Sequence, residues 1–111
     1  MKVESRFWIT EDGKKVFGKG VYQLLNGIRK FGSLNKAAKE LNMSYSKAWA
    51  IIKRSEEGLK YPLLERKIGG AYGGGSFLTN KAVQFIEAYE KFHNEVEYYI
   101  QKLYDKHFKD I

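Results

Sequence analysis

The sequence predicts a mainly helical α+β fold in two parts, a basic N-terminal domain and a long C-terminal helix. Three observations lead to this prediction: segregated charge, short helical patterns lying between two strand pairs, and one long apolar repeat. Residues 1–77 carry 15 Lys and Arg against 7 Asp and Glu, whereas residues 78–111 carry 5 Lys against 6 Asp and Glu. We therefore expect domains at 1–78 and 79–111, and a polyanionic partner for the first.

The composition of the chain excludes several classes of protein. With 111 residues, 43% of them apolar, the chain has enough apolar side chains for one folded domain, and its formal charge is +7. The sequence has no cysteine, which excludes disulfides and thiolate chemistry from these residues. No apolar run approaches the roughly 20 residues of a membrane span, and the first residues lack a signal-peptide pattern. We expect a cytoplasmic protein without membrane contacts.

The first third of the sequence predicts a hairpin followed by a helix. Strand-forming residues flank Asp12-Gly13, a dipeptide typical of tight hairpin turns. From Gly20 to Phe31 an apolar residue recurs at every third or fourth position, which is the spacing of one helical face. Gly32 is then expected to end the helix in a left-handed conformation.

Two further helices are predicted close together. Ser33 and Ser44 are expected N-caps for helices at 34–41 and 45–57. Asn42 tolerates a left-handed backbone, which favours a tight turn between the two helices. Alanines on the inner faces permit the close crossing of a helix-turn-helix, although the spacing alone also fits an ordinary helical hairpin.

A second strand pair follows these helices and makes the prediction more specific. Strand-forming residues at 63–68 and 77–78 flank a glycine-rich segment at 69–76. A helix-turn-helix followed by a β-hairpin is the winged-helix arrangement, with the glycine-rich segment at the tip of the wing. The segment joins two strands and lacks the Gly-Lys-Ser/Thr ending of a phosphate loop, so nucleotide binding is not expected.

The C-terminal part predicts one helix that begins after Thr79 or Asn80 and ends near Phe108. Its apolar residues are spaced alternately by four and three positions, which is a heptad seam. A helix of about 30 residues is too long to be buried by so small a domain, so we expect it to pair with a second copy, in either direction. The residues assigned to dimerisation are Phe85, Tyr89, Phe92, Val96, Tyr99 and Leu103.

The helix predicted at 45–57 has the features of a helix that enters a DNA groove. Its small outer residues allow close approach, while Lys53 and Arg54 supply donors for phosphate or guanine. Trp49 lies beside them, although an aromatic at helical spacing is more often a core residue. Lys36 and Lys47 lie in first helical turns, where a docked phosphate would offset their repulsion from the helix dipole. A tolerated exposed lysine would explain the same two positions.

No catalytic or metal site is predicted from the sequence. The two histidines, His93 and His107, are fourteen positions apart on the long helix, and no carboxylate cluster accompanies them. We therefore expect no enzymatic activity, no cofactor and no metal.

Two stretches resemble a known family. The first, from Ser33 to Trp49, ends in the pattern Ser-Tyr-x-x-Ala-Trp, and the second, from Leu64 to Thr79, contains Leu-Glu-Arg, two runs of glycine and Leu-Thr. Both resemble the N-terminal DNA-binding domain of ModE, the molybdate-responsive bacterial regulator. The similarity extends more distantly to the winged helices of LysR-type regulators.

The resemblance implies a winged helix-turn-helix that binds operator DNA as a homodimer and regulates transcription. It implies that the first residues of the helix at 45–57 lie at the groove and that the wing contacts the DNA backbone. With the lysines chosen above, the predicted DNA-binding residues are Lys36, Ser44, Tyr45, Ser46, Lys47, Trp49, Lys53, Arg54, Arg66, Lys67 and Tyr72.

Two expectations qualify this function. ModE proteins also carry C-terminal molybdate-binding domains, for which this sequence has no counterpart, so molybdate binding is not expected. The alternative function is a winged-helix module for protein interaction or dimerisation that no longer reads DNA, with the acidic tail as its functional part.

Overall fold

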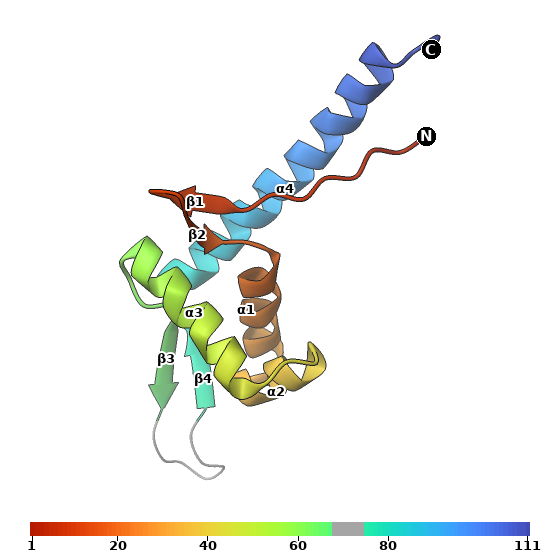
Figure 1. Ribbon diagram of the computed structural model, residues 1–111. Coiled ribbons are helices and arrows are strands. Elements are labelled where there is room, and N and C mark those ends of the chain that lie inside the picture. Colours follow the sequence, from red (N-terminus) through yellow and green to blue (C-terminus); the bar gives the residue numbers. More distant parts are fainter. Residues whose placement is uncertain (68–74) are drawn as a thin grey trace.

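The computed structural model describes residues 1–67 and 75–111, and its elements follow the predicted order (Figure 1). An N-terminal hairpin is formed by β1 (Ile9–Glu11) and β2 (Lys14–Phe17). Three helices follow it, namely α1 (Lys19–Phe31), α2 (Leu34–Glu40) and α3 (Tyr45–Leu59). A second antiparallel hairpin, β3 (Leu64–Lys67) and β4 (Gly75–Leu78), leads to α4 (Asn80–His107). The mainly helical α+β prediction is therefore confirmed.

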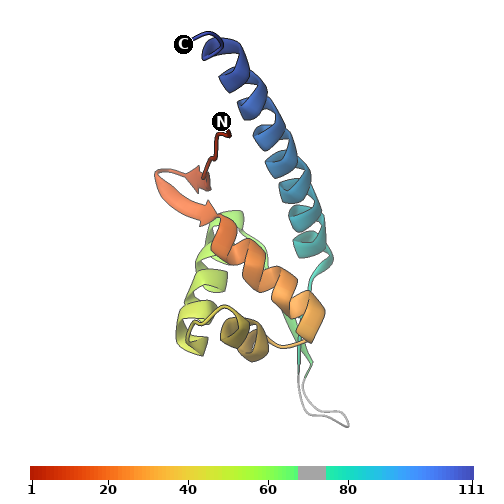
Figure 2. The same cartoon turned by 90° about the vertical axis from the view of Figure 1, so that its right-hand side faces the viewer.

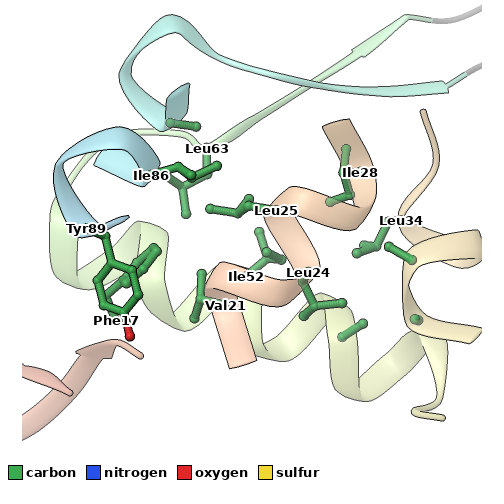
Figure 3. Packing of buried hydrophobic residues seen from close by; sticks show 14 of the residues in the cluster. Phe17, Val21, Leu24, Leu25, Ile28, Leu34, Ile52, Leu63, Ile86 and Tyr89 are labelled. Carbon is green, nitrogen blue, oxygen red and sulfur yellow. The ribbon is translucent and has the colours of Figure 1, made fainter. Parts of the chain in front are cut away.

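The apolar face of α1 forms the centre of the core. Its residues Val21, Leu24, Leu25 and Ile28 are each no more than 2% exposed. This face contacts α2, α3, α4, β2 and β4, and Figure 3 shows Leu63 and the α4 residue Ile86 packed against it. Burial of such a side chain contributes about 1.5–3 kcal/mol, so α1 holds the other elements together mainly by the hydrophobic effect.

The caps and turns that the sequence predicts around α2 are confirmed. Gly32 ends α1 in the left-handed region, with φ at 70°. The hydroxyls of Ser33 and Ser44 accept backbone N–H bonds from Lys36 and Lys47 at 3.2 and 3.1 Å. Asn42 has a φ of 55°, so it makes the predicted left-handed turn between α2 and α3. These local interactions fix the angle at which α3 leaves α2.

The end of α3 differs from the predicted range of 45–57, because the helix continues through Gly58 to Leu59. Gly58 lies inside the helix at a close approach, where an added Cβ would lie 2.6 Å from a methyl carbon of Val16. The hydroxyl of Ser55 donates a buried hydrogen bond to the Val16 carbonyl. Glycine at this position therefore permits packing against β2, and Lys60, with φ at 67°, is the C-cap that follows Leu59.

Thr79 joins the second hairpin to α4. Its backbone N–H donates to the Leu63 carbonyl at 3.0 Å, and its hydroxyl donates to the Pro62 carbonyl at 2.9 Å. The same hydroxyl accepts from the Ala82 N–H at 3.1 Å, so Thr79 is the N-cap. The base of the hairpin and the start of α4 are therefore fixed to each other by one residue.

The structure corrects the predicted dimerisation seam in the first half of α4. Tyr89 is 6% exposed, and the ring centroids of Phe85 and Tyr89 lie 4.4 and 5.1 Å from that of Phe17. The two residues pack against the chain's own core because β2 and α1 lie against this part of the helix. The first residues of the heptad seam thus pack against the chain's own core. The remaining seam residues lie on the second half of α4, which projects from the rest of the molecule (Figure 2).

The first residues of the chain run beside α4, which the sequence did not predict (Figure 1). The side chain of Gln101 accepts from the Val3 N–H at 3.0 Å and donates to the Met1 carbonyl at 3.3 Å. Phe7 packs edge-on against Phe92, with ring centroids 5.3 Å apart. These contacts place the N-terminal segment along one side of the projecting helix.

Polar contacts also join α1 to α4. The Tyr22 hydroxyl donates to the Glu90 carboxylate at 2.9 Å, and an Arg29 guanidinium nitrogen lies 3.7 Å from the same oxygen. Burial raises the pKa of Tyr22, and the bond to Glu90 raises it further. Burial likewise raises the pKa values of Tyr61 and Tyr89.

Within residues 1–67 and 75–111, no helix has the length and apolar character of a membrane span.

The crossing of α1 and α2 provides a test of the packing. At Gly27 an added Cβ would lie 2.7 Å from the Ala37 Cβ and 3.3 Å from its Cα, whereas Gly20 on the same helix has nothing within 4 Å. We expect Gly27→Ala to lower the free energy of unfolding by about 1–2 kcal/mol, since overpacking outweighs the gain in helix propensity. Gly20→Ala should leave it unchanged or raise it by up to about 1 kcal/mol. Urea denaturation measures both, and equal effects would contradict the close crossing.

The cap of α3 provides a second test. Ser44→Ala removes the acceptor of the Lys47 N–H and should lower the free energy of unfolding by about 1 kcal/mol. Ser46→Ala is the matched control, because Ser46 is exposed two residues further along and caps nothing. Its effect should stay within about 0.5 kcal/mol in the same denaturation experiment. A control variant as unstable as Ser44→Ala would show that the cap has no special role.

Candidate nucleic-acid interface

The exposed face of α3 is the main surface of the candidate interface. Ala48, Ile52 and Ser55 are at most 2% exposed and fix the inner side of the helix against the core. The outer side therefore faces solvent along its whole length. Its exposed predicted residues are Ser44, Tyr45, Ser46, Lys47, Trp49, Lys53 and Arg54.

Trp49 lies on this outer face. Its side chain is 43% exposed, so it is not the core residue that its helical spacing also allowed. The Lys53 ammonium lies 5.2 Å from the centroid of the Trp49 ring and 3.2 Å from a Glu56 carboxylate oxygen. In this structure Lys53 is therefore held along the helix by two neighbours. A contact between Lys53 and a phosphate would have to compete with Glu56.

The other predicted cations on the helices have fewer constraints. Lys36 and Lys47 are exposed in the first turns of α2 and α3, close to backbone N–H groups that carry the positive end of the helix dipole. Arg54 is exposed on α3 and has no ion pair with the described part of the chain. Their charges are therefore available for a solvent-side anion.

The second hairpin lies next to the start of α3, and the backbone fixes its position. The Ser76 N–H of β4 donates to the Gly32 carbonyl at 3.2 Å, and an added Cβ at Gly75 would lie 3.0 Å from that oxygen. Strand β3 pairs with β4 in register, with Arg66 opposite Ser76. The hairpin is thus anchored at the junction of α1 and α2.

The structure brings Arg66 and Tyr45 together. A guanidinium nitrogen of Arg66 donates to the Tyr45 hydroxyl oxygen at 2.8 Å, and both residues are exposed. The sequence predicted each residue separately as DNA-binding. Nothing in it indicated that these two side chains, 21 positions apart, would form a hydrogen bond. Tyr72 and the side chain of Lys67 lie outside the described residues.

A second candidate surface occupies the projecting half of α4. Phe92, Tyr99 and Leu103 are 51%, 59% and 53% exposed, and Val96 between them is half-buried. These residues are the remaining members of the predicted seam.

Among the described residues, no group of three His, Asp or Glu side chains is arranged to hold a metal ion.

Comparison with known proteins places this chain among bacterial regulators. Residues 22–81 match the family described as bacterial regulatory helix-turn-helix protein, lysR family. Transcriptional regulator ModE of Haemophilus influenzae is 36% identical over 84 residues, which are 76% of this chain and 33% of that protein. Molybdenum transport protein ModE of Azotobacter vinelandii is 37% identical over 76 residues, which are 68% of this chain and 27% of that protein.

The matched stretch covers only part of these relatives. The chain spans about a quarter to a third of their length, roughly the N-terminal DNA-binding domain of ModE. Among solved structures, a point mutant of Lactococcus lactis ZitR matches 95% of this chain and 71% of that chain, with a TM-score of 0.55 and 20% identity. At that identity the likeness supports the fold alone. Since the family match covers both the helix-turn-helix and the second hairpin, the chain belongs to the lysR family of bacterial regulatory helix-turn-helix proteins.

Proposed function

We propose that the chain is a DNA-binding transcription regulator that acts as a homodimer. Residues 1–78 bind DNA, with α3 in the major groove and the wing on the backbone, and residues 79–111 pair the two copies. The observation that carries the proposal is the exposed outer face of α3, whose first residues lie beside Arg66 of the second hairpin. The regulator names of the relatives support the same function.

The proposed groove contacts come from the first half of α3. In helix-turn-helix proteins the N-terminal residues of the second helix contact base edges, while the preceding helix crosses the backbone. Tyr45, Ser46 and Trp49 are exposed at the corresponding positions. Ser46 is small enough for close approach to the groove floor, and Lys47 follows it directly. Arg54 adds a positive charge about two turns further along the helix. This arrangement combines base contact with phosphate contact on one helix face.

The wing extends the proposed interface past the start of α3. Arg66 is exposed on β3, and the glycine-rich segment at 69–76, with Lys67 and Tyr72, continues from it along the chain. The hairpin is anchored to the Gly32 carbonyl, so its position is set by the same junction that sets α2. We propose that the wing contacts the DNA backbone while α3 occupies the adjacent groove.

Pairing of two chains is proposed for the exposed part of the seam. Phe92, Tyr99 and Leu103 present apolar side chains to solvent on a helix that leaves the rest of the molecule. A second α4 laid along this face would bury them, and each buried side chain would contribute about 1.5–3 kcal/mol. The opposite end of each molecule would remain free to bind DNA.

Charge reversal on α3 tests the DNA contact. Lys47→Glu and Arg54→Glu should each weaken binding by about 10–100-fold, because hydrogen bonds to charged groups are worth about 1.5–3 kcal/mol. Lys91→Glu, an identical charge change on α4, is the matched control and should have little effect. Fluorescence anisotropy at several salt concentrations measures binding to duplexes that the wild-type protein selects from random DNA. Salt-independent binding, or equal effects of all three variants, would contradict the proposal.

A charged residue in the exposed seam tests pairing. Leu103→Glu should weaken the dimer by about 100-fold or more, because two copies of the leucine lose their burial. Since Leu103 is 53% exposed in one chain, the helical circular dichroism of the monomer should be unchanged. Sedimentation velocity measures the association, with Lys91→Glu again as the control. A dimer that survives Leu103→Glu and dissociates in Lys47→Glu would instead favour pairing through the basic domain.

A further inference from the structure

One contact joins the two elements of the interface directly. A guanidinium nitrogen of Arg66 donates to the Tyr45 hydroxyl oxygen over 2.8 Å. Tyr45 is the first residue of α3, and Arg66 lies in β3, opposite Ser76 of β4. The bond therefore joins the start of the helix to the hairpin, through two side chains on the solvent side.

Both side chains project from backbone that is fixed independently of this bond. The Ser44 cap and the burial of Ala48 hold the first turn of α3. The pairing of β3 with β4, and the bond from Ser76 to the Gly32 carbonyl, hold the hairpin. The hydrogen bond therefore contributes little to the stability of the fold. Its effect is to restrict the rotamers of the Arg66 side chain, which is otherwise flexible.

The chemistry of the pair leaves the positive charge of Arg66 available. Guanidinium has five N–H donors, and a phenol oxygen occupies one of them without neutralising the cation. A carboxylate at the same place would have cancelled the charge. No ion pair to Arg66 exists within residues 1–67 and 75–111. The remaining donors suit a phosphate, which guanidinium binds in a bidentate manner.

We propose that Tyr45 is a positioning residue that holds the Arg66 guanidinium ready for a DNA phosphate at the edge of the groove that α3 enters. The proposal rests on the proposed DNA-binding function and adds to it a coupling between two named residues. Without the tyrosine hydroxyl, the arginine would have to become ordered during binding. The loss of such preorganisation corresponds to a weakening of about 3- to 10-fold.

A double-mutant cycle tests this coupling. The probe is one fixed duplex of mixed sequence, and anisotropy is measured over a range of salt concentrations for Tyr45→Phe, Arg66→Ala and the double variant. Tyr45→Phe should weaken binding about 3- to 10-fold and keep a salt slope close to that of the wild type, because the phosphate contact survives. Arg66→Ala should weaken binding at least as much and reduce the slope by about 1. In the Arg66→Ala background, Tyr45→Phe should then have no further effect.

Tyr98→Phe is the matched control for Tyr45→Phe, because it makes the same change at an exposed position of α4. This variant should bind DNA like the wild type. Additive losses in the cycle would overturn the proposal, because they would mean that the Tyr45 hydroxyl acts on DNA binding independently of Arg66. Wild-type affinity in Tyr45→Phe would also overturn it, while salt-dependent binding of the wild type would leave the proposed function intact. A wild-type protein without salt-dependent binding would overturn both.

Discussion

Burial of one face of α1 is the interaction on which the rest of the structure depends. Leu24 and Leu25 are fully buried, and the helix that carries them contacts α2, α3, α4, β2 and β4. The C-terminal end of α1 contributes through the backbone as well, because the Gly32 carbonyl accepts the Ser76 N–H. The candidate interface is thus built from α2, α3 and the second hairpin, each of which α1 helps to hold in place. Their common support is α1, which itself takes no part in the proposed contacts.

The features that the sequence predicts correctly are mostly those that depend on local interactions. The Ser33 and Ser44 caps, the left-handed Gly32 and the turn at Asn42 each depend on residues a few positions apart, so their patterns are visible in the sequence. The exposure of the predicted α3 residues follows from helical periodicity in the same way. The order of elements and the outer face of the helix were therefore predictable.

The features that the sequence did not predict depend on contacts between residues far apart along the chain. Glycine breaks many helices, and only the position of Val16 across the core explains why Gly58 lies inside α3. A heptad seam shows which residues of α4 lie on one face, but not which partner covers them, and Tyr89 turned out to face Phe17 of the same chain. At the candidate site, the Arg66–Tyr45 bond joins residues 21 positions apart, and it depends on rotamers that neither residue type specifies.

The contacts of Gln101 with the first residues of the chain place both termini at the same end of a molecule that is 63 Å long (Figure 1). The second hairpin lies at the other end. A fluorophore or an affinity tag attached at either terminus would therefore be distant from the helix-turn-helix. Energy transfer between labels on two chains would report how their long helices are arranged, without a probe in the proposed DNA contact.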